Sequence, residues 1–244
     1  MVLDIALIVV GILITIVSLV SCVISIWLFR RYRRFNKQEN SLGKTGTQIA
    51  REILDNNGLQ HIQVKRTGSL FFGNSYSHYF KKVRLRSFIR HENSLTSVGM
   101  GAQKAALAIL DKENDPDMRK RIRMVPLITF GPFAFIPLIV IGALLDFYVF
   151  NESGVCTIAL GSLGVLFYAY AVLWSVRTLK TERKAQQRAY EILREDYRIT
   201  ESELADLKDL FHLYNVQYIN DIILSSLELL YTILKVAAEI SKNK

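Results

Sequence analysis

The sequence predicts a mainly α membrane protein with three to four transmembrane helices and a small cytoplasmic α+β domain. Half of the 244 residues are hydrophobic, and they gather in long runs without charge at 5–29, 124–145 and 153–176. Each run is long enough to cross a hydrocarbon core of about 30 Å at about 1.5 Å per residue. Between the runs, helical and alternating patterns predict a folded polar region.

The first run predicts a permanent transmembrane anchor over residues 1–29. No basic segment precedes it, Asp4 lies at its start, and it is longer than the apolar core of a cleavable signal peptide. We therefore expect this helix to stay in the membrane.

The net charge of +9 is concentrated beside the apolar runs, whereas the loop at 151–154 has no Lys or Arg. Basic residues follow the first run, precede the second and follow the third: Arg30, Arg31, Arg33, Arg34 and Lys37; Arg119, Lys120, Arg121 and Arg123; Arg177, Lys180, Arg183 and Lys184. The positive-inside rule then predicts an external N-terminus, an external loop at 151–154 and polar segments in the cytoplasm. Basic residues beside a span are explained by this topology and need no nucleic-acid partner. We therefore expect the lipid bilayer, and not nucleic acid, as a partner.

The predicted second and third transmembrane helices cover residues 124–150 and 155–176. Pro126, Pro132 and Pro137 fall within the second helix. A proline frees a backbone carbonyl that neighbouring groups must satisfy, so we expect a kinked, bundle-packed helix. These prolines also suggest a channel or transporter, although the sequence has no repeated halves.

The first polar segment, residues 30–123, combines helices and strands. Apolar residues at helical spacing predict a helix over 47–54, ended by Asn56, Asn57 and Gly58. Alternation predicts short strands at 61–65 and 83–86, with a loop at 68–78 between them. A helix rich in small residues follows at 94–110, and Asp115-Pro116-Asp117 ends it.

The second polar segment, residues 177–220, predicts further cytoplasmic helices. Ala185, Ala189, Ile192 and Leu193 form an apolar side over 181–193, and a capping box at 200–203 starts another helix. The last segment, 221–244, carries one polar stripe: Asp221, Ser225, Glu228, Thr232, Lys235 and Glu239. It is either a fourth span, which its continuous apolar face favours, or an amphipathic helix in the membrane interface.

Taken in order, these segments resemble the YugP-type neutral zinc metallopeptidases of bacterial membranes. The similarity is carried by residues 45–54 with Gly58, Leu59 and Val64, then 82–85, 94–108 and 181–185, and Tyr218. The resemblance implies a zincin-like cytoplasmic domain, a zinc cofactor and a bacterial plasma (inner) membrane location. In that family, a His-Glu-x-x-His motif follows a run of small residues. Its two histidines lie one helical turn apart and reach one Zn²⁺, while the glutamate acts as base on the metal-bound water.

In this sequence the motif is degenerate. Gln103 stands at the first His, Lys104 at the Glu and Leu107 at the second His. An amide is a poor zinc ligand, an ammonium repels Zn²⁺, and leucine has no donor atom. The family's stretch resembling Asp-His-Tyr-Asp has also changed, to Asn74-Ser75-Tyr76-Ser77, of which the Tyr alone matches.

Glu182 matches the family's third zinc ligand and is a possible remnant of the metal site, although a glutamate in the first turn of a helix needs no other role. The degenerate motif predicts a catalytically inactive pseudopeptidase that binds no metal. The alternative is an active zinc metallopeptidase with non-standard ligands, Glu182 together with His78 or His91.

A pseudopeptidase acts by binding, so we expect a protein complex in the membrane. The predicted partner is an intact paralogue or another membrane protein. Candidate interaction residues are the small residues of the motif helix and two members of the polar stripe: Gly99, Ala102, Ala106, Glu228 and Lys235. Packing within the chain is the other explanation for both sets.

Overall fold

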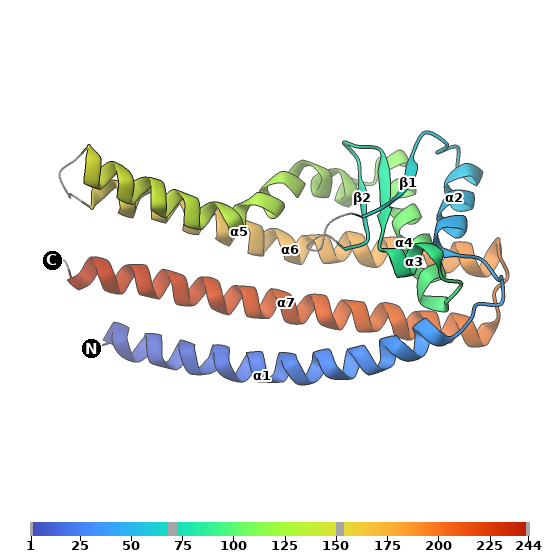
Figure 1. The fold of residues 1–244 in the computed structure, drawn as a ribbon, viewed down its shortest axis with the longest axis horizontal. Helices are drawn as coiled ribbons and strands as arrows, with labels where there is room; N and C mark the ends of the chain where they lie inside the picture. Colours follow the sequence, from blue (N-terminus) through green and yellow to red (C-terminus); the bar gives the residue numbers. More distant parts are fainter. Residues whose placement is uncertain (1, 68–72, 150–153, 243–244) are drawn as a thin grey trace. The chain divides into compact units, whose positions relative to one another are not determined.

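The computed structural model describes residues 2–67, 73–149 and 154–242, and the chain is mainly helical with a small sheet (Figure 1). The elements in chain order are α1 (Val2–Lys37), α2 (Gly46–Asn56), β1 (Gln63–Arg66), β2 (Ser75–Ser77), β3 (Lys82–Leu85), α3 (Ser87–His91), α4 (Leu95–Lys112), α5 (Pro116–Tyr148), α6 (Val155–Glu195) and α7 (Glu201–Lys242).

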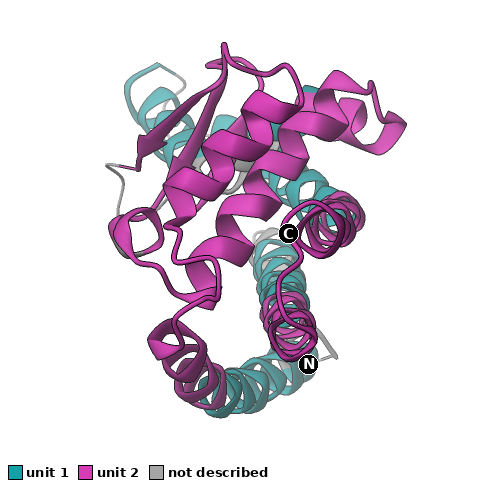
Figure 2. Ribbon diagram, turned by 90° about the vertical axis from the view of Figure 1, so that its right-hand side faces the viewer, with its two compact units in different colours: residues 1–24, 123–177, 218–244 teal, residues 25–122, 178–217 magenta. Residues whose placement is uncertain are grey.

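The chain forms two compact units (Figure 2). Unit 1 comprises residues 1–24, 123–177 and 218–244 and is built from segments of the four long helices α1, α5, α6 and α7. Unit 2 comprises residues 25–122 and 178–217 and contains the sheet, α2, α3, α4 and the remaining parts of the long helices. The predicted polar segments thus fall largely in unit 2.

Unit 1 carries the apolar helices. Among the described residues, two helices are long and apolar enough to cross a membrane, α1 over 5–37 and α6, and α5 has a shorter apolar stretch at Ile136–Tyr148. Their large apolar side chains are exposed, as for Ile8 at 63 % and Leu166 at 65 %. Exposed apolar surface of this extent is what lipid contact requires. Residues 151–153 of the predicted external loop at 151–154 lie outside the described residues, and the depth of 221–244 stays a prediction.

Two long helices cross the predicted boundaries of the second polar segment, residues 177–220. α6 runs without a break from Val155 to Glu195, and α7 from Glu201 to Lys242. No Gly or Pro occurs in α6 after Gly164 or anywhere in α7, so neither helix has a residue that would end it. The predicted capping box starts α7: Thr200 N donates to Glu203 Oε2 (3.1 Å) and Glu203 N to Thr200 Oγ1 (3.3 Å).

The sheet has the order β1-β3-β2, with β3 parallel to β1 and antiparallel to β2. The predicted strands at 61–65 and 83–86 correspond to β1 and β3, and Val83 and Leu85 of β3 are fully buried. The prediction of a loop over 68–78 was wrong at Ser75–Ser77, which forms β2. This strand is polar because it lies at the edge of the sheet and is half-buried, so it lacks an apolar alternation.

The predicted small-residue helix is α4, and it is the buried centre of unit 2. Ser94 caps its start, accepting a hydrogen bond from Ser97 N at 3.2 Å, and every residue from Leu95 to Leu110 is buried. The helix packs closely against α2, because a Cβ at Gly101 would collide with the backbone carbonyl of Gly46. Small residues here therefore allow two backbones to touch.

We expect Gly101→Ala to lower the free energy of unfolding by about 1–3 kcal/mol, since the added Cβ meets backbone atoms of Gly46 that cannot rotate away. Gly99→Ala is the matched control on the same helix. Its Cβ would meet the Leu207 side chain, which has rotamer freedom, and the loss should be smaller. Thermal unfolding of the two variants in detergent tests this ranking, and equal losses would contradict it.

Candidate functional site

The degenerate motif faces the predicted third ligand position inside unit 2. α4 carries Gln103 and Lys104, α6 carries Glu182, and α5 adds Arg121. The Lys104 ammonium Nζ lies 3.0 Å from Glu182 Oε2, and the Gln103 amide Nε2 donates to the same oxygen at 2.9 Å. Arg121 Nη2 donates to Glu182 Oε1 at 2.6 Å. Both oxygens of the carboxylate are therefore engaged by donors from this chain.

This cluster is largely shielded from water. The exposed fraction of the side chain is 9 % for Lys104 and 15 % for both Arg121 and Glu182. Burial by itself raises the pKa of Glu182, but the charges of Arg121 and Lys104 outweigh it and lower that pKa to about 2. Glu182 is thus ionised at neutral pH, and the cluster carries two positive charges and one negative charge.

The Gln103 amide has one orientation that suits this site. Its NH₂ group points to the Glu182 carboxylate, because the opposite orientation would set two acceptor oxygens against each other. Gln103 Oε1 is then buried with no hydrogen-bond partner among the described residues, and the same holds for Arg121 Nη1. A buried unsatisfied polar group costs about 1–3 kcal/mol, so the arrangement is held by its ionic contacts.

The start of α5 is fixed against α6 by a second ionic contact. Asp115 Oδ1 accepts from the backbone N–H groups of Asp117 and Met118 and so caps α5. Lys184 Nζ lies 2.7 Å from Asp115 Oδ2 and 2.6 Å from Asp117 Oδ2. Arg121 lies one turn after Asp117 on α5, and its guanidinium contacts the Glu182 carboxylate of α6.

These residues do not fit a zinc ion. Zinc sites use three or four thiolate, imidazole or carboxylate ligands, and here Glu182 is the one such group in the cluster. Its oxygens already accept from a lysine and an arginine, whose charges would repel a dication. Leu107, one turn after Gln103, is completely buried and has no donor atom. No group of three or more His, Cys, Asp or Glu placed to hold a metal occurs among the described residues.

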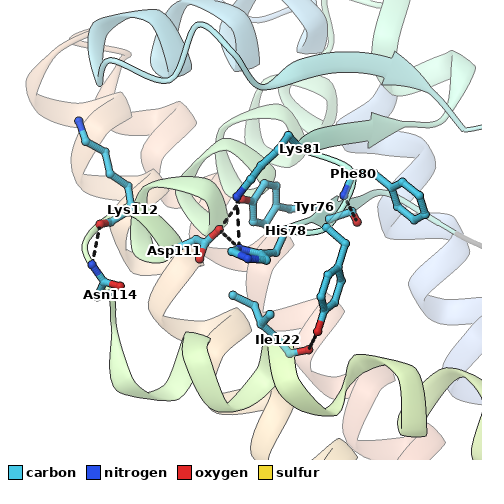
Figure 3. A network of polar contacts seen from close by, with 10 residues as sticks. Tyr76, His78, Phe80, Lys81, Asp111, Lys112, Asn114 and Ile122 are labelled. Carbon is cyan, nitrogen blue, oxygen red and sulfur yellow. Dashed lines mark hydrogen bonds and ion pairs between the residues drawn. The ribbon is translucent and has the colours of Figure 1, made fainter.

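The two histidines proposed as alternative ligands lie elsewhere. His78 Nδ1 is 2.6 Å from Asp111 Oδ2, which also accepts from the Tyr76 hydroxyl at 2.6 Å (Figure 3). Burial, followed by the hydrogen bond to Asp111, raises the pKa of Tyr76 above its ordinary value. His91 is the exposed last residue of α3. Tyr76, the surviving residue of the changed 74–77 stretch, thus joins β2 to the end of α4.

The predicted interaction residues divide between the two units. Gly99, Ala102 and Ala106 are buried within unit 2, and Gly99 packs against Leu207 of α7, so their close helix contacts are made inside this chain. In unit 1, Glu228 accepts from the Tyr168 hydroxyl at 3.1 Å, and Lys235 is exposed. A role for any of these residues in binding a partner stays a prediction.

Sequence reasoning missed Arg121 as a member of the site. It was grouped with the basic residues that flank the predicted second span, 61 positions before Glu182. Nothing in the local sequence separates it from Arg119 or Arg123. The charges carried one signal. A buried Glu182 carboxylate needs positive partners, and of the two α4 residues beside it Gln103 is neutral and Lys104 alone is charged, which leaves room for a second basic residue.

Comparison with known proteins gives the ancestry of this fold. The family model described as "Putative neutral zinc metallopeptidase" matches residues 10–237. The curated protein "Putative membrane protease YugP" of Bacillus subtilis (strain 168) is 25 % identical over 200 residues, covering 82 % of this chain and 84 % of the relative. No solved structure matches the chain. Since the family model spans both units and every residue of the Glu182 cluster, the chain belongs to the neutral zinc metallopeptidase family.

Proposed function

We propose that the chain is a catalytically inactive member of this family, a pseudopeptidase that acts as a binding or scaffold subunit of a membrane complex. The observation that supports this most directly is the Lys104 ammonium at 3.0 Å from Glu182. It brings positive charge to the carboxylate that the resemblance assigns to zinc. The chain's own lysine and arginine thus take the electrostatic role of the metal.

The chemistry of proteolysis is missing from the same residues. A zinc peptidase needs an open coordination position on the metal and a carboxylate base beside the bound water. Lys104 occupies the position of that base and cannot accept a proton while its ammonium is paired with Glu182. The residues that remain can hold helices α4, α5 and α6 together, which favours a structural or binding role.

We further propose that the protein resides in the plasma (inner) membrane and that its partner is an intact paralogue or another membrane protein. Support for a membrane location comes from the exposed apolar side chains of α1 and α6 and from the name of the Bacillus subtilis relative. A subunit that keeps the family's fold can occupy a family member's place in a complex without cleaving what it binds.

The test is the zinc content of the detergent-purified protein, measured by elemental analysis after zinc loading and desalting. We expect a value close to zero per chain. A family member that keeps His-Glu-x-x-His, purified and loaded in parallel, is the control and should retain about one zinc ion. Tight zinc binding together with hydrolysis of a casein substrate would overturn the proposal.

A further inference from the structure

The turn between β2 and β3 exposes two neighbouring aromatic side chains. Tyr79 is 59 % exposed and Phe80 is 62 % exposed, so more than half of each side chain is open to the surroundings. The turn itself is well defined: Lys81 adopts a left-handed conformation (φ 47°), and Phe80 N donates to Ser77 Oγ at 3.4 Å. The sheet therefore presents these rings on a fixed support.

The turn is anchored on both sides. His78 pairs with Asp111 at the end of α4, and the Tyr79 hydroxyl donates to the backbone carbonyl of Ile122 in α5 at 3.3 Å. Figure 3 shows Phe80 lying apart from the Asp111 contacts. The tyrosine is thus held by its polar end, while the phenylalanine ring has no polar group to hold it.

The carbonyl of Ile122 has a specific need for this hydroxyl. In an α-helix it would accept from the N–H of the residue four positions later, which is Pro126 and has no N–H. Tyr79 supplies the missing donor. The turn is thereby tied to the helical residue that lies two positions before the uncharged run 124–145.

Basic side chains surround the aromatic pair. Lys81 and Lys82 adjoin it in sequence, and the Arg84 guanidinium lies 5.3 Å from the centre of the Phe80 ring. Arg119 and Lys120 of α5 are exposed within one turn of Ile122. The acidic groups nearby are engaged elsewhere, Asp111 by His78 and Tyr76, and Asp115 and Asp117 by Lys184.

We propose that the β2–β3 turn, residues 78–81, is an interfacial membrane anchor. Tyr79 and Phe80 enter the headgroup region of the leaflet that α5 enters, and Lys81, Lys82, Arg119 and Lys120 bind anionic phospholipid headgroups. Aromatic rings favour the membrane–water interface, and basic residues beside a span attract anionic lipids. Because the turn is hydrogen-bonded to Ile122, two residues before the uncharged run of α5, the bilayer is the occupant of this surface that we propose.

The anchor is testable with the full chain carrying Phe80→Trp, reconstituted into vesicles of phosphatidylcholine and phosphatidylglycerol. We expect tryptophan emission shifted to shorter wavelength than in water and quenched when the acyl chains carry bromine near the headgroup. Ser202→Trp is the control, because Ser202 is exposed and lies about 30 Å along α7 from Asp221 at about 1.5 Å per residue. Its emission should be water-like and indifferent to bromine. The parent protein corrects for Trp27 and Trp174.

A second pair of substitutions tests whether the basic residues bind anionic headgroups. In the Phe80→Trp background, Lys81→Gln with Lys82→Gln should reduce quenching in vesicles that contain phosphatidylglycerol and leave it unchanged in pure phosphatidylcholine. Water-like emission from Trp at position 80 in both lipids would overturn the proposal. Emission that is shielded from water but insensitive to brominated lipid would also overturn it, by pointing to a protein on this surface.

Discussion

The triple variant Gln103→His, Lys104→Glu, Leu107→His is expected to take up about one zinc ion per chain, against almost none for the parent. The three positions lie on one buried helix, and positions 103 and 107 are one turn apart, which is the spacing two imidazoles need. Glu182 already contacts positions 103 and 104 and would serve as the third protein ligand. Elemental analysis after loading and desalting measures the gain.

Two further variants show whether the metal occupies the intended place. Adding Glu182→Ala to the triple variant should bring zinc occupancy well below one, because a three-ligand site would lose a ligand. Adding Glu195→Gln, an exposed carboxylate of the same helix, should leave occupancy unchanged. A folded triple variant that stays free of zinc would show either that position 107 does not share a site with Glu182 or that the Arg121 guanidinium, which remains on Glu182, still excludes the metal.

Glu182→Gln in the parent is expected to lower the free energy of unfolding by about 3–5 kcal/mol. The change leaves Lys104 and Arg121 buried with no negative charge between them. Lys104→Met should cost less, because Glu182 keeps its contact with Arg121. Thermal or denaturant unfolding in detergent, followed by circular dichroism, ranks these variants against Glu195→Gln, which should be nearly neutral.

The same contact predicts a pH dependence with a defined sign. The pKa of Glu182 is lowered in the folded protein, from 4.5 to about 2. Its contribution to stability is therefore complete above about pH 4.5 and declines as the pH falls toward 2, because the unfolded chain binds the proton first. The stability difference between parent and Glu182→Gln should narrow over that range. A difference that is constant with pH would mean that the charge of Glu182 does not hold the cluster.

Much of unit 2 follows from local patterns in the sequence. Ser94 and the small residues after it predict α4, the box at Thr200 and Glu203 predicts the start of α7, and Val83 with Leu85 predicts the buried strand β3. Each signal is local, because a cap or an alternation involves residues within one turn or one strand. The replacement of the zinc motif at Gln103 and Lys104 can also be recognised from the sequence alone.

The remaining features depend on contacts between distant residues. β2 is polar and has no apolar alternation, so its pairing with β3 and the link from Tyr76 to Asp111 specify it. Arg121 has the same local setting as Arg119, and the fold alone places it at Glu182 while leaving Arg119 exposed. The hydrogen bond from Tyr79 to Ile122 likewise joins residues 43 positions apart. Pro126 indicates from the sequence that the Ile122 carbonyl needs another donor, but not which residue supplies it.

The contact between Lys104 and Glu182 bears on how the stability of the protein depends on the metal concentration around it. A protein stabilised by a bound metal gains stability in proportion to the logarithm of the free metal concentration, so scarcity of that metal shortens its lifetime. A cation attached to the chain itself is present in every copy and is indifferent to chelators. If zinc becomes scarce, a protein that depends on the metal is weakened, whereas the contact between Lys104 and Glu182 is unaffected. Under the proposed function, the ratio of inactive to active family members in a membrane would then follow the zinc supply of the cell.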